Sequence, residues 1–175
     1  LAKQYGVTTG EPLAQALRKC PQLTVVPSRF NYYIKCSHRM MELLETYTPD
    51  HEKFSIDEIF LDMTQTIHLF GQPLEVANRI RERIRDELGF TVNIGVAPNK
   101  LLAKMASEFQ KPDQVHTLFT WEIERKMWPL PVNELFWVGP ATARKLRALG
   151  IRTIGALAAS DLELLKRHLK KQGEF

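Results

Sequence analysis

Two adjacent carboxylates, Asp57 and Glu58, interrupt a segment that otherwise has the composition of buried β-structure. Phe54 and Ile56 precede the pair, and an apolar run begins again at Ile59. Acidic side chains are almost never fully buried unless they are paired or bound to a metal ion. The pair therefore either lies in water at the end of a strand or forms part of a cation site.

The geometry of a strand limits how these two side chains can act together. In one continuous strand, Asp57 and Glu58 would point to opposite faces, because successive side chains alternate. Both can serve one site only if the chain turns between two strands, which we expect at residues 53–56 and 59–63. The sequence thus predicts a β-hairpin whose turn carries the pair. Asp62 lies further along the outgoing strand, where we expect a surface position or an ion pair.

Paired carboxylates on a rigid sheet suit phosphoryl transfer, for which a protein supplies positioning and charge neutralisation rather than covalent chemistry. Such sites commonly hold two divalent ions bridged by carboxylates. Mg²⁺ prefers one or two carboxylates, with substrate phosphates and water completing its coordination. A two-metal Mg²⁺ site at Asp57 and Glu58 is one interpretation of the pair, and a solvated acidic turn is the other.

The hydrophobic pattern predicts alternating strands and helices around the acidic pair. The expected strands are 53–56, 59–63, 91–97 and 115–119, and the expected helices between them are 73–88 and 99–109. This β-β-α-β-α-β order is typical of an α+β layer, a sheet backed by two helices. The 73–88 helix has the most regular apolar stripe, formed by Leu74, Ala77, Ile80, Ile84 and Leu88. Two more helices are expected upstream, at 10–20 and 32–46.

Beyond Pro129-Leu130-Pro131, which is typical of a domain boundary, the pattern is helical. Helices are expected at 132–136, 141–149 and 153–158, and a last one begins at Ser160, which would form a capping box with Glu163. Free N–H groups at a helix N-terminus bind phosphate, and small side chains let a DNA backbone approach. The candidate DNA-binding residues are Gly139, Ala141, Thr142, Ala143, Arg144 and Lys145. An ordinary helical hairpin with a Gly-Pro turn has the same pattern.

The charge distribution favours a polyanion as the partner of this last segment. The chain has 24 Lys and Arg against 20 Asp and Glu, a net charge of +4. Residues 132–175 contain eight of these cations and four of these anions, so the excess lies entirely in this segment. A solvated basic face is the alternative. Lys111, held on a turn by Pro112, is similarly either an anion contact, for example to a triphosphate, or an exposed loop lysine.

Composition excludes several other classes. With 44% hydrophobic and 25% charged residues, the 175-residue chain is an ordinary globular sequence. It has no apolar run near the roughly 20 residues of a membrane-spanning helix, and no signal peptide is visible. Cys20 and Cys36 match no zinc spacing, so we expect two buried thiols in an intracellular protein. Because the chain begins at Leu1, we expect a processed or truncated piece.

In collinear order, these motifs resemble those of Y-family translesion DNA polymerases of the bacterial UmuC/DinB type. Residues 55–62, SIDEIFLD, resemble the catalytic S-[IV]-D-E-x-x-x-D block of that family. Residues 93–112 resemble its second palm block, and residues 135–158 resemble its thumb, which is built on a helix-hairpin-helix. Residues 2–7, AKQYGV, resemble the tail of the fingers motif Y-x-A-[RK]-x-x-G-[VI], although the Tyr is absent.

The resemblance implies a fold of three parts. These are the end of the fingers at 1–28, a palm at 29–118 without its first strand, and an incomplete thumb at 119–175. The palm would be an α+β, ferredoxin-like sheet backed by helices, and the thumb would be a small all-α helix-hairpin-helix. A further catalytic Asp and the aromatic gate against ribonucleotides would lie upstream of the chain, and the little finger would follow it. We therefore expect an interior fragment that is inactive by itself.

The resemblance also implies roles for single residues. Asp57 and Glu58 would be the catalytic ligands of Mg²⁺, and Lys111 and Lys3 would contact the triphosphate of the incoming dNTP. Primer-template DNA would be the other partner, and a sliding clamp would be reached through parts outside this chain. The setting implied is cytoplasmic and nucleoid-associated, in DNA repair and the SOS response, with no membrane partner. Trp137 stands where the hairpin often has Gly, a departure that affects close phosphate approach.

Two other function classes fit part of the pattern. Another palm-type two-metal nucleotidyl transferase or cyclase would have a similar acidic hairpin, but it would not need a helix-hairpin-helix after the palm. A DNA-binding accessory protein with a decayed palm is the non-enzymatic alternative, and the presence of both Asp57 and Glu58 argues against decay. Primer extension by the intact protein would separate an enzyme from an accessory protein.

Overall fold

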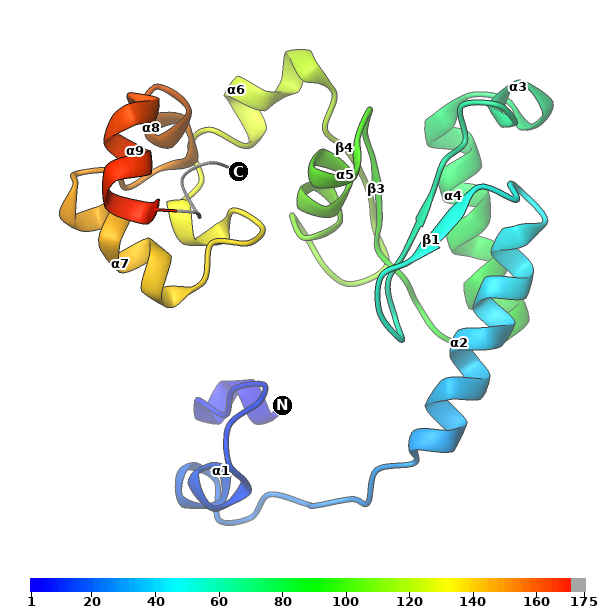
Figure 1. Ribbon diagram of the computed structural model, residues 1–175. Helices are drawn as coiled ribbons and strands as arrows, with labels where there is room; N and C mark the ends of the chain where they lie inside the picture. Colours follow the sequence, from blue (N-terminus) through cyan, green and yellow to red (C-terminus); the bar gives the residue numbers. More distant parts are fainter. Residues whose placement is uncertain (171–175) are drawn as a thin grey trace. The chain divides into compact units, whose positions relative to one another are not determined.

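The computed structural model of the protein describes residues 1–170, which divide into two compact units, Leu1–Lys35 and the chain from Cys36 onward. The first unit contains η1 (Ala2–Tyr5), α1 (Leu13–Lys19) and the beginning of α2 (Phe30–Glu45) (Figure 1). Both upstream helices agree with the predicted ones within three residues. Ala16 and Cys20 are buried in this unit, whereas Cys36 is only half-buried.

The predicted hairpin is present, but both strands are shorter than expected, and the first one begins and ends earlier. β1 (His51–Lys53) pairs antiparallel with β2 (Ile59–Leu61). The first strand ends before Phe54 because the backbone N–H groups of Phe54 and Ser55 both turn back to the carbonyl of Glu58. At the open end, the hydroxyl of buried Thr48 donates to the carbonyl of Asp62 at 2.8 Å. The hairpin is therefore fixed at both ends.

The rest of the α+β part follows the predicted order, with one addition. Its elements are α3 (Ile67–Phe70), α4 (Pro73–Arg83), a π-helical turn (Ile84–Leu88), β3 (Ile94–Val96), α5 (Lys100–Ser107) and β4 (Val115–Thr117). The short helix α3 was not predicted. β3 and β4 are parallel and connected by α5, as a crossover requires. The four strands form two two-stranded ladders instead of the single sheet expected.

A hydrophobic core joins α2 and α4 to the strands. It contains Met40, Leu44, Val76, Ile80 and Ile84, with Ile94 of β3 packed against it. The predicted stripe of the 73–88 helix is correct except at its start, where Leu74 is 48% exposed and Val76 is buried instead. The buried positions Val76, Ile80 and Ile84 are four residues apart. The face of the helix that packs on the core therefore includes Val76 and leaves Leu74 outside.

Helix α5 packs on the ladder β3–β4 through its backbone. A Cβ atom at Gly95 would lie 1.9 Å from the carbonyl oxygen of Ala103, so only glycine permits this approach. Gly95 and Ala97 face α5, whereas Ile94 packs with α2 and α4. Because neighbouring side chains of a strand alternate, α4 and α5 lie on opposite sides of this ladder (Figure 1).

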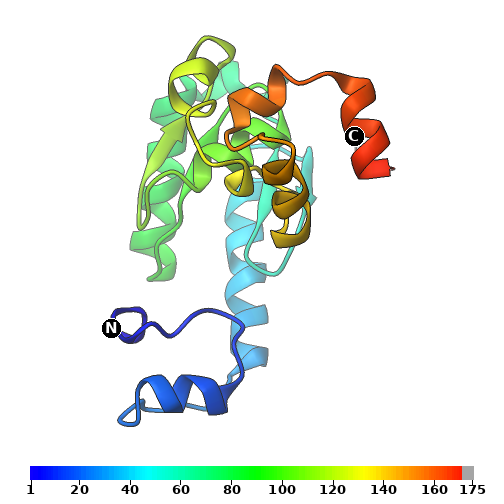
Figure 2. The same cartoon turned by 90° about the vertical axis from the view of Figure 1, so that its left-hand side faces the viewer.

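The C-terminal part is helical, as predicted, and its short helices are joined by segments without regular structure (Figure 2). They are η3 (Thr120–Glu122), α6 (Ile123–Lys126), η4 (Val132–Glu134), α7 (Pro140–Ala148), α8 (Ile154–Ala158) and α9 (Leu162–Leu169). The predicted cap at Ser160 was wrong. Asp161 caps α9 by accepting from Leu164 N at 2.8 Å, and the Ser160 hydroxyl instead donates to the carbonyl of Ala156. Within residues 1–170, no helix has the length and hydropathy needed to cross a membrane.

Two cores hold this part together. Val132, Leu146, Ile151 and Leu169 form one of them. The other contains Leu102, Met105 and Ala106 of α5 together with Leu118, Met127 and Ile154. Since α5 belongs to the α+β part and Ile154 to the helical part, the two parts share a hydrophobic core across the Pro129-Leu130-Pro131 segment.

Candidate active site

Asp57 and Glu58 lie next to each other in the loop between β1 and β2, where the sequence predicts them. The Ser55 hydroxyl donates to Asp57 Oδ1 at 2.8 Å. The carbonyl oxygen of Glu58 accepts from Phe54 N and Ser55 N at 3.0 and 3.1 Å, which closes the loop by its own backbone. Asp57 is exposed and Glu58 is half-buried. The loop therefore presents two carboxylates to solvent from a fixed backbone.

Glu58 is the first member of a chain of ion pairs. Lys104 Nζ, on α5, lies 2.6 Å from Glu58 Oε1 and 2.8 Å from Glu108 Oε1. Lys111 Nζ lies 2.7 Å from Glu108 Oε2. Two carboxylates and two ammonium groups thus alternate from the hairpin loop, along α5, to the turn at Lys111. The structure brings Lys111 into the neighbourhood of Glu58 through residues that sequence reasoning did not single out.

The ion pairs shift the ionisation of their inner members. Burial opposes the charge on Lys104, but hydrogen bonds to Glu108 and Glu58 outweigh it and raise the pKa of this lysine. Burial likewise opposes ionisation of Glu108, but hydrogen bonds from Lys104 and Lys111 hold its pKa below the ordinary value. Both groups are therefore charged across the neutral pH range.

The remaining predicted residues of the site lie apart from this chain of charges. Asp62 is exposed, and its carboxylate accepts from Thr64 N at 2.9 Å. Hydrogen bonds from Thr64, with attraction from Lys100, lower the pKa of Asp62. The surface position expected for Asp62 is thus the observed one. Lys3 is exposed in η1 of the first compact unit, and its proposed contact with a triphosphate stays a prediction.

The donor set can supply part of a divalent-cation site. Among the described residues, no group of three or more His, Cys, Asp and Glu side chains is placed to hold a metal ion. Asp57 and Glu58 nevertheless provide hard oxygen donors of the kind that Mg²⁺ prefers. Within residues 1–170, the recorded side-chain contacts of the pair involve Asp57 Oδ1 and Glu58 Oε1, which leaves Oδ2 and Oε2 for a cation. Phosphate, water or further residues must complete such a site.

The candidate DNA-binding turn lies at the start of α7. Gly139 precedes the helix with φ −71° and open space around the position of a Cβ atom, and Pro140 takes the first helical position. Arg144 and Lys145 are exposed. Ala143 is only 1% exposed and packs in the interior, so its side chain is part of the core and cannot contact DNA directly. Ala141 is exposed and Thr142 half-buried, and contacts of the turn with DNA stay a prediction.

An aromatic group connects the acidic loop with the segment before α7. The ring of Phe54 lies 5.8 Å from Phe60, 5.8 Å from Phe136 and 6.1 Å from Trp137, in each case edge to face. Lys104 Nζ lies 5.8 Å from the centre of the Phe136 ring. The side chains that surround Glu58 therefore include residues of the helical part, which the sequence pattern did not reveal.

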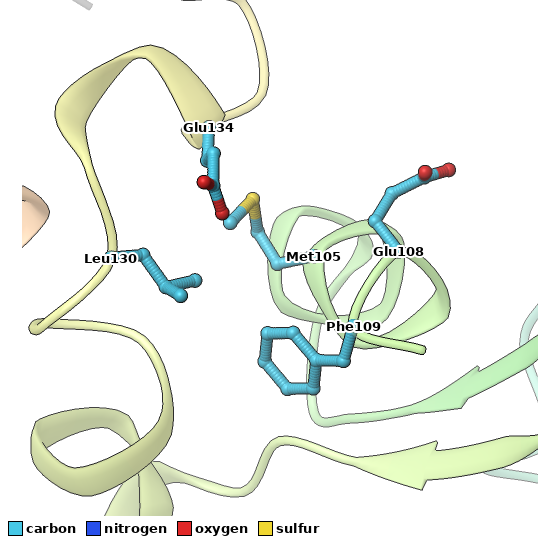
Figure 3. A pocket seen from close by; sticks show the side chains of 5 residues that line it. All are labelled: Met105, Glu108, Phe109, Leu130 and Glu134. Carbon is cyan, nitrogen blue, oxygen red and sulfur yellow. The ribbon is translucent and has the colours of Figure 1, made fainter. Parts of the chain in front are cut away.

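A pocket of about 360 Å³ lies between the end of α5 and the residues from Leu130 to Glu134, and Glu108 is one of its lining residues. Met105, Phe109 and Leu130 form its apolar wall, and Glu108 and Glu134 stand at its rim (Figure 3). Its residues come from the end of α5 and from the segment that leads to η4. In Figure 3 the carboxylate of Glu108 points away from Met105 and Phe109. Its ion pairs are those with Lys104 and Lys111.

The fold and the acidic loop define an α+β palm followed by a helix-hairpin-helix. Residues 1–108 match the impB/mucB/samB family, and residues 122–151 match the helix-hairpin-helix motif described for the IMS family. The first match covers more than half of the chain. The chain therefore belongs to the impB/mucB/samB family.

Curated relatives of the chain include DNA polymerase IV of Clostridium acetobutylicum, which is 53% identical over 174 residues. This alignment covers 99% of the present chain and 44% of the relative. DNA polymerase IV 1 of Bacillus subtilis is 45% identical over 172 residues, which are 98% of this chain and 41% of that protein. The chain thus spans less than half the length of these relatives.

Solved structures agree with the sequence matches. The crystal structure of DinB from Sulfolobus solfataricus superimposes with a TM-score of 0.88 at 31% identity, covering 98% of this chain and 51% of that chain. A structure named as an insertion ternary complex of Dbh DNA polymerase gives a TM-score of 0.87 at the same identity. The resemblance to Y-family polymerases is confirmed, as are the α+β palm and the helix-hairpin-helix.

Proposed function

We propose that the chain is part of a DNA-directed DNA polymerase that copies damaged templates by two-metal nucleotidyl transfer. The observation that carries the proposal is the presentation of Asp57 and Glu58 on a closed hairpin loop, beside the lysines of α5 and its following turn. Relatives named DNA polymerase IV and a neighbour named as an insertion ternary complex support it. The chain covers 44% of the first of these relatives, so the activity belongs to a longer protein.

In the proposed reaction, Asp57 and Glu58 hold divalent ions, with Mg²⁺ as the expected metal. The bound metal would neutralise the developing charge of the triphosphate and align the reacting oxygens. The loop supports this role because its backbone hydrogen bonds fix the two carboxylates without burying them. Lys111, and Lys3 in the first unit, would bind the triphosphate of the incoming dNTP.

The helix-hairpin-helix supports duplex binding by the same protein. Gly139 and Ala141 at the start of α7 leave room for a phosphate, and Arg144 and Lys145 add positive charge one turn further on. Contacts of this kind position a duplex without reading its sequence. We propose primer-template DNA as the ligand of residues 139–145, with Ala143 contributing packing only.

The assignment of residue ranges to the fingers, palm and thumb follows the resemblance to Y-family polymerases. Residues 1–28 would form the end of the fingers, residues 29–118 most of the palm, and residues 119–175 part of the thumb. A sliding clamp would bind outside this chain, and the protein would act at the nucleoid in the cytoplasm, within the SOS response to DNA damage. Because the palm of this chain supplies two carboxylates, we expect the 175-residue chain alone not to extend a primer.

Primer extension by the whole protein tests the proposal. Asp57→Asn and Glu58→Gln should each abolish incorporation, because they keep the shape of the side chain but remove a metal ligand. Asp62→Asn is the matched control on the same hairpin and should retain activity, since its exposed carboxylate accepts from Thr64 N just beyond the end of β2. Wild-type protein that binds primer-template but never incorporates a nucleotide would instead identify an accessory protein.

A further inference from the structure

Lys104 and Glu108 are two charged residues of the site to which the proposed function gives no role. The side chain of Lys104 is only 13% exposed, and its ammonium group is shared by Glu58 and Glu108 at 2.6 and 2.8 Å. Phe136 lies close to the same ammonium group, 5.8 Å away at the ring centre. A largely buried ammonium loses more on separation from its partners than an exposed one. Lys104 therefore has to remain paired with at least one of the two carboxylates.

Glu108 is shared in the same way by two cations. Its Oε1 atom accepts from both Lys104 and Lys111 at 2.8 Å, and its Oε2 atom lies 2.7 Å from Lys111 Nζ. The chain Glu58, Lys104, Glu108, Lys111 carries two positive and two negative charges and is neutral as a whole. One end is the proposed metal ligand, and the other end is the proposed triphosphate contact.

We propose that Lys104 and Glu108 are positioning residues that exchange partners when metal and nucleotide bind. In the free protein, Lys104 neutralises Glu58, and Glu108 neutralises Lys111. When a triphosphate binds Lys111, Glu108 loses that partner and pairs with Lys104 alone. The ammonium group of Lys104 then moves toward Glu108, and Glu58 becomes available to a divalent ion. The inference rests on the proposed function, because it requires Glu58 as a metal ligand and Lys111 as the triphosphate contact.

The exchange keeps every partly buried charge compensated. Lys104 is paired with both carboxylates in the first state and with Glu108 in the second, so it is never left alone. Metal and triphosphate each replace one ion pair at opposite ends of the same chain. By linkage, each ligand then favours the binding of the other beyond their direct attraction.

Binding measurements on the whole 175-residue chain test this exchange. The probes are Mn²⁺ alone, followed by electron paramagnetic resonance, and tripolyphosphate alone in metal-free buffer, followed by calorimetry. Glu108→Gln should weaken Mn²⁺ binding and strengthen tripolyphosphate binding, each about two- to fivefold, the range expected for one partly exposed ion pair. Glu52→Gln removes the same charge from β1, where the partner is Lys100, and should change both affinities less than about twofold.

Removing the negative charge of Glu108 would by itself also weaken Mn²⁺ binding and strengthen tripolyphosphate binding. A double-mutant cycle separates this direct electrostatic effect from partner exchange. If Glu108 acts on the metal through Lys104, Glu108→Gln will not change Mn²⁺ affinity in a Lys104→Met background. The effect of Glu108→Gln on tripolyphosphate affinity depends on Lys111 and will persist in the Lys104→Met background. Additive effects of the two substitutions on Mn²⁺ binding would overturn the exchange. Lys104→Gln replaces Lys104→Met if circular dichroism shows that the latter does not fold.

Asp57→Asn distinguishes failure of this inference from failure of the proposed function. Loss of Mn²⁺ binding in this variant, together with an additive cycle at Lys104 and Glu108, overturns the exchange alone. Unchanged Mn²⁺ affinity in the variant overturns the metal site at the hairpin, and the exchange with it.

Discussion

The rings of Phe54 and Trp137 meet edge to face, with their centroids 6.1 Å apart and their planes at 82°. Phe54 opens the loop that carries the acidic pair, and Trp137 comes three residues before Pro140, where α7 begins. Trp137 is 77% exposed and has a φ of 73°, in the left-handed region that favours glycine. A large side chain therefore occupies a strained position where its contacts with Phe54 and Phe136 offset the strain.

Substitutions at Trp137 should separate the strain from the aromatic contacts. Trp137→Ala loses the contacts and keeps the unfavourable backbone, whereas Trp137→Gly loses the contacts and relieves the backbone. We expect the glycine variant to be more stable than the alanine variant by about 0.5–1 kcal/mol, after allowance for the greater entropy of unfolded glycine. Urea unfolding of the two variants measures the difference. Equal stability would mean that residue 137 is not left-handed in solution.

The packing of α5 on β3 predicts a large effect of one methyl group. Gly95→Ala places a Cβ atom 1.9 Å from Ala103 O and 2.7 Å from Ser107 N, both of which are backbone atoms that cannot rotate away. We expect a loss of at least about 3 kcal/mol in the free energy of unfolding, the upper range of overpacking. Gly139→Ala is the control, because nothing lies within 4 Å of its added Cβ and its φ is negative. This control should cost less than about 1 kcal/mol.

The ion pairs of Glu108 and Lys104 predict how stability depends on pH. The pKa of Glu108 is lowered, so its stabilisation is present above the ordinary value of 4.5 and is lost as the pH falls through the folded-state pKa. The pKa of Lys104 is raised, so its contribution is present below 10.5 and is lost as the pH rises through the folded-state pKa. Glu108→Gln should therefore lower Tm at neutral pH, and the difference from wild type should disappear in acid. Thermal unfolding across the pH range measures this difference. A Tm difference that persists below both the folded-state and the unfolded-state pKa of Glu108 would contradict the assignment.

Local sequence pattern was sufficient to predict the acidic hairpin and most of the helices. Side chains alternate along a strand, so Asp57 and Glu58 can serve one site only if the chain turns between two strands, and the structure has this turn. Helical spacing predicted α4 and α7 because each presents a continuous apolar face. At Leu74, the neighbouring Val76 satisfies the same helical spacing. At Ser160, the neighbouring Asp161 is also a favourable N-cap residue, although it forms no capping box with Glu163.

The charged environment of the site could not be predicted in the same way. Glu58 and Lys104 are 46 residues apart in the chain, and no periodicity links them. The four-residue spacing of Lys104 and Glu108 was a signal for their ion pair, whereas Lys111 follows on the turn after α5. The contact of Phe54 with Phe136 and Trp137 depends on how the helical part packs on α5, which is a property of the shared core around Met105 and Ile154.

The last prediction concerns the turn before α7 and its cations. We expect the chain to bind duplex DNA weakly and without sequence preference, with a Kd of roughly 10⁻⁴ to 10⁻⁶ M at physiological salt. Each phosphate neutralised lowers log K by about 0.9 per unit of log salt. Arg144→Ala with Lys145→Ala should therefore weaken binding for all duplex sequences alike and reduce the salt slope by up to about 2. Arg79→Ala with Lys111→Ala removes the same charge elsewhere and should leave the slope nearly unchanged. Titrations at several salt concentrations decide between the alternatives: if the Arg144 and Lys145 variant keeps the wild-type slope, the hairpin has only a structural role.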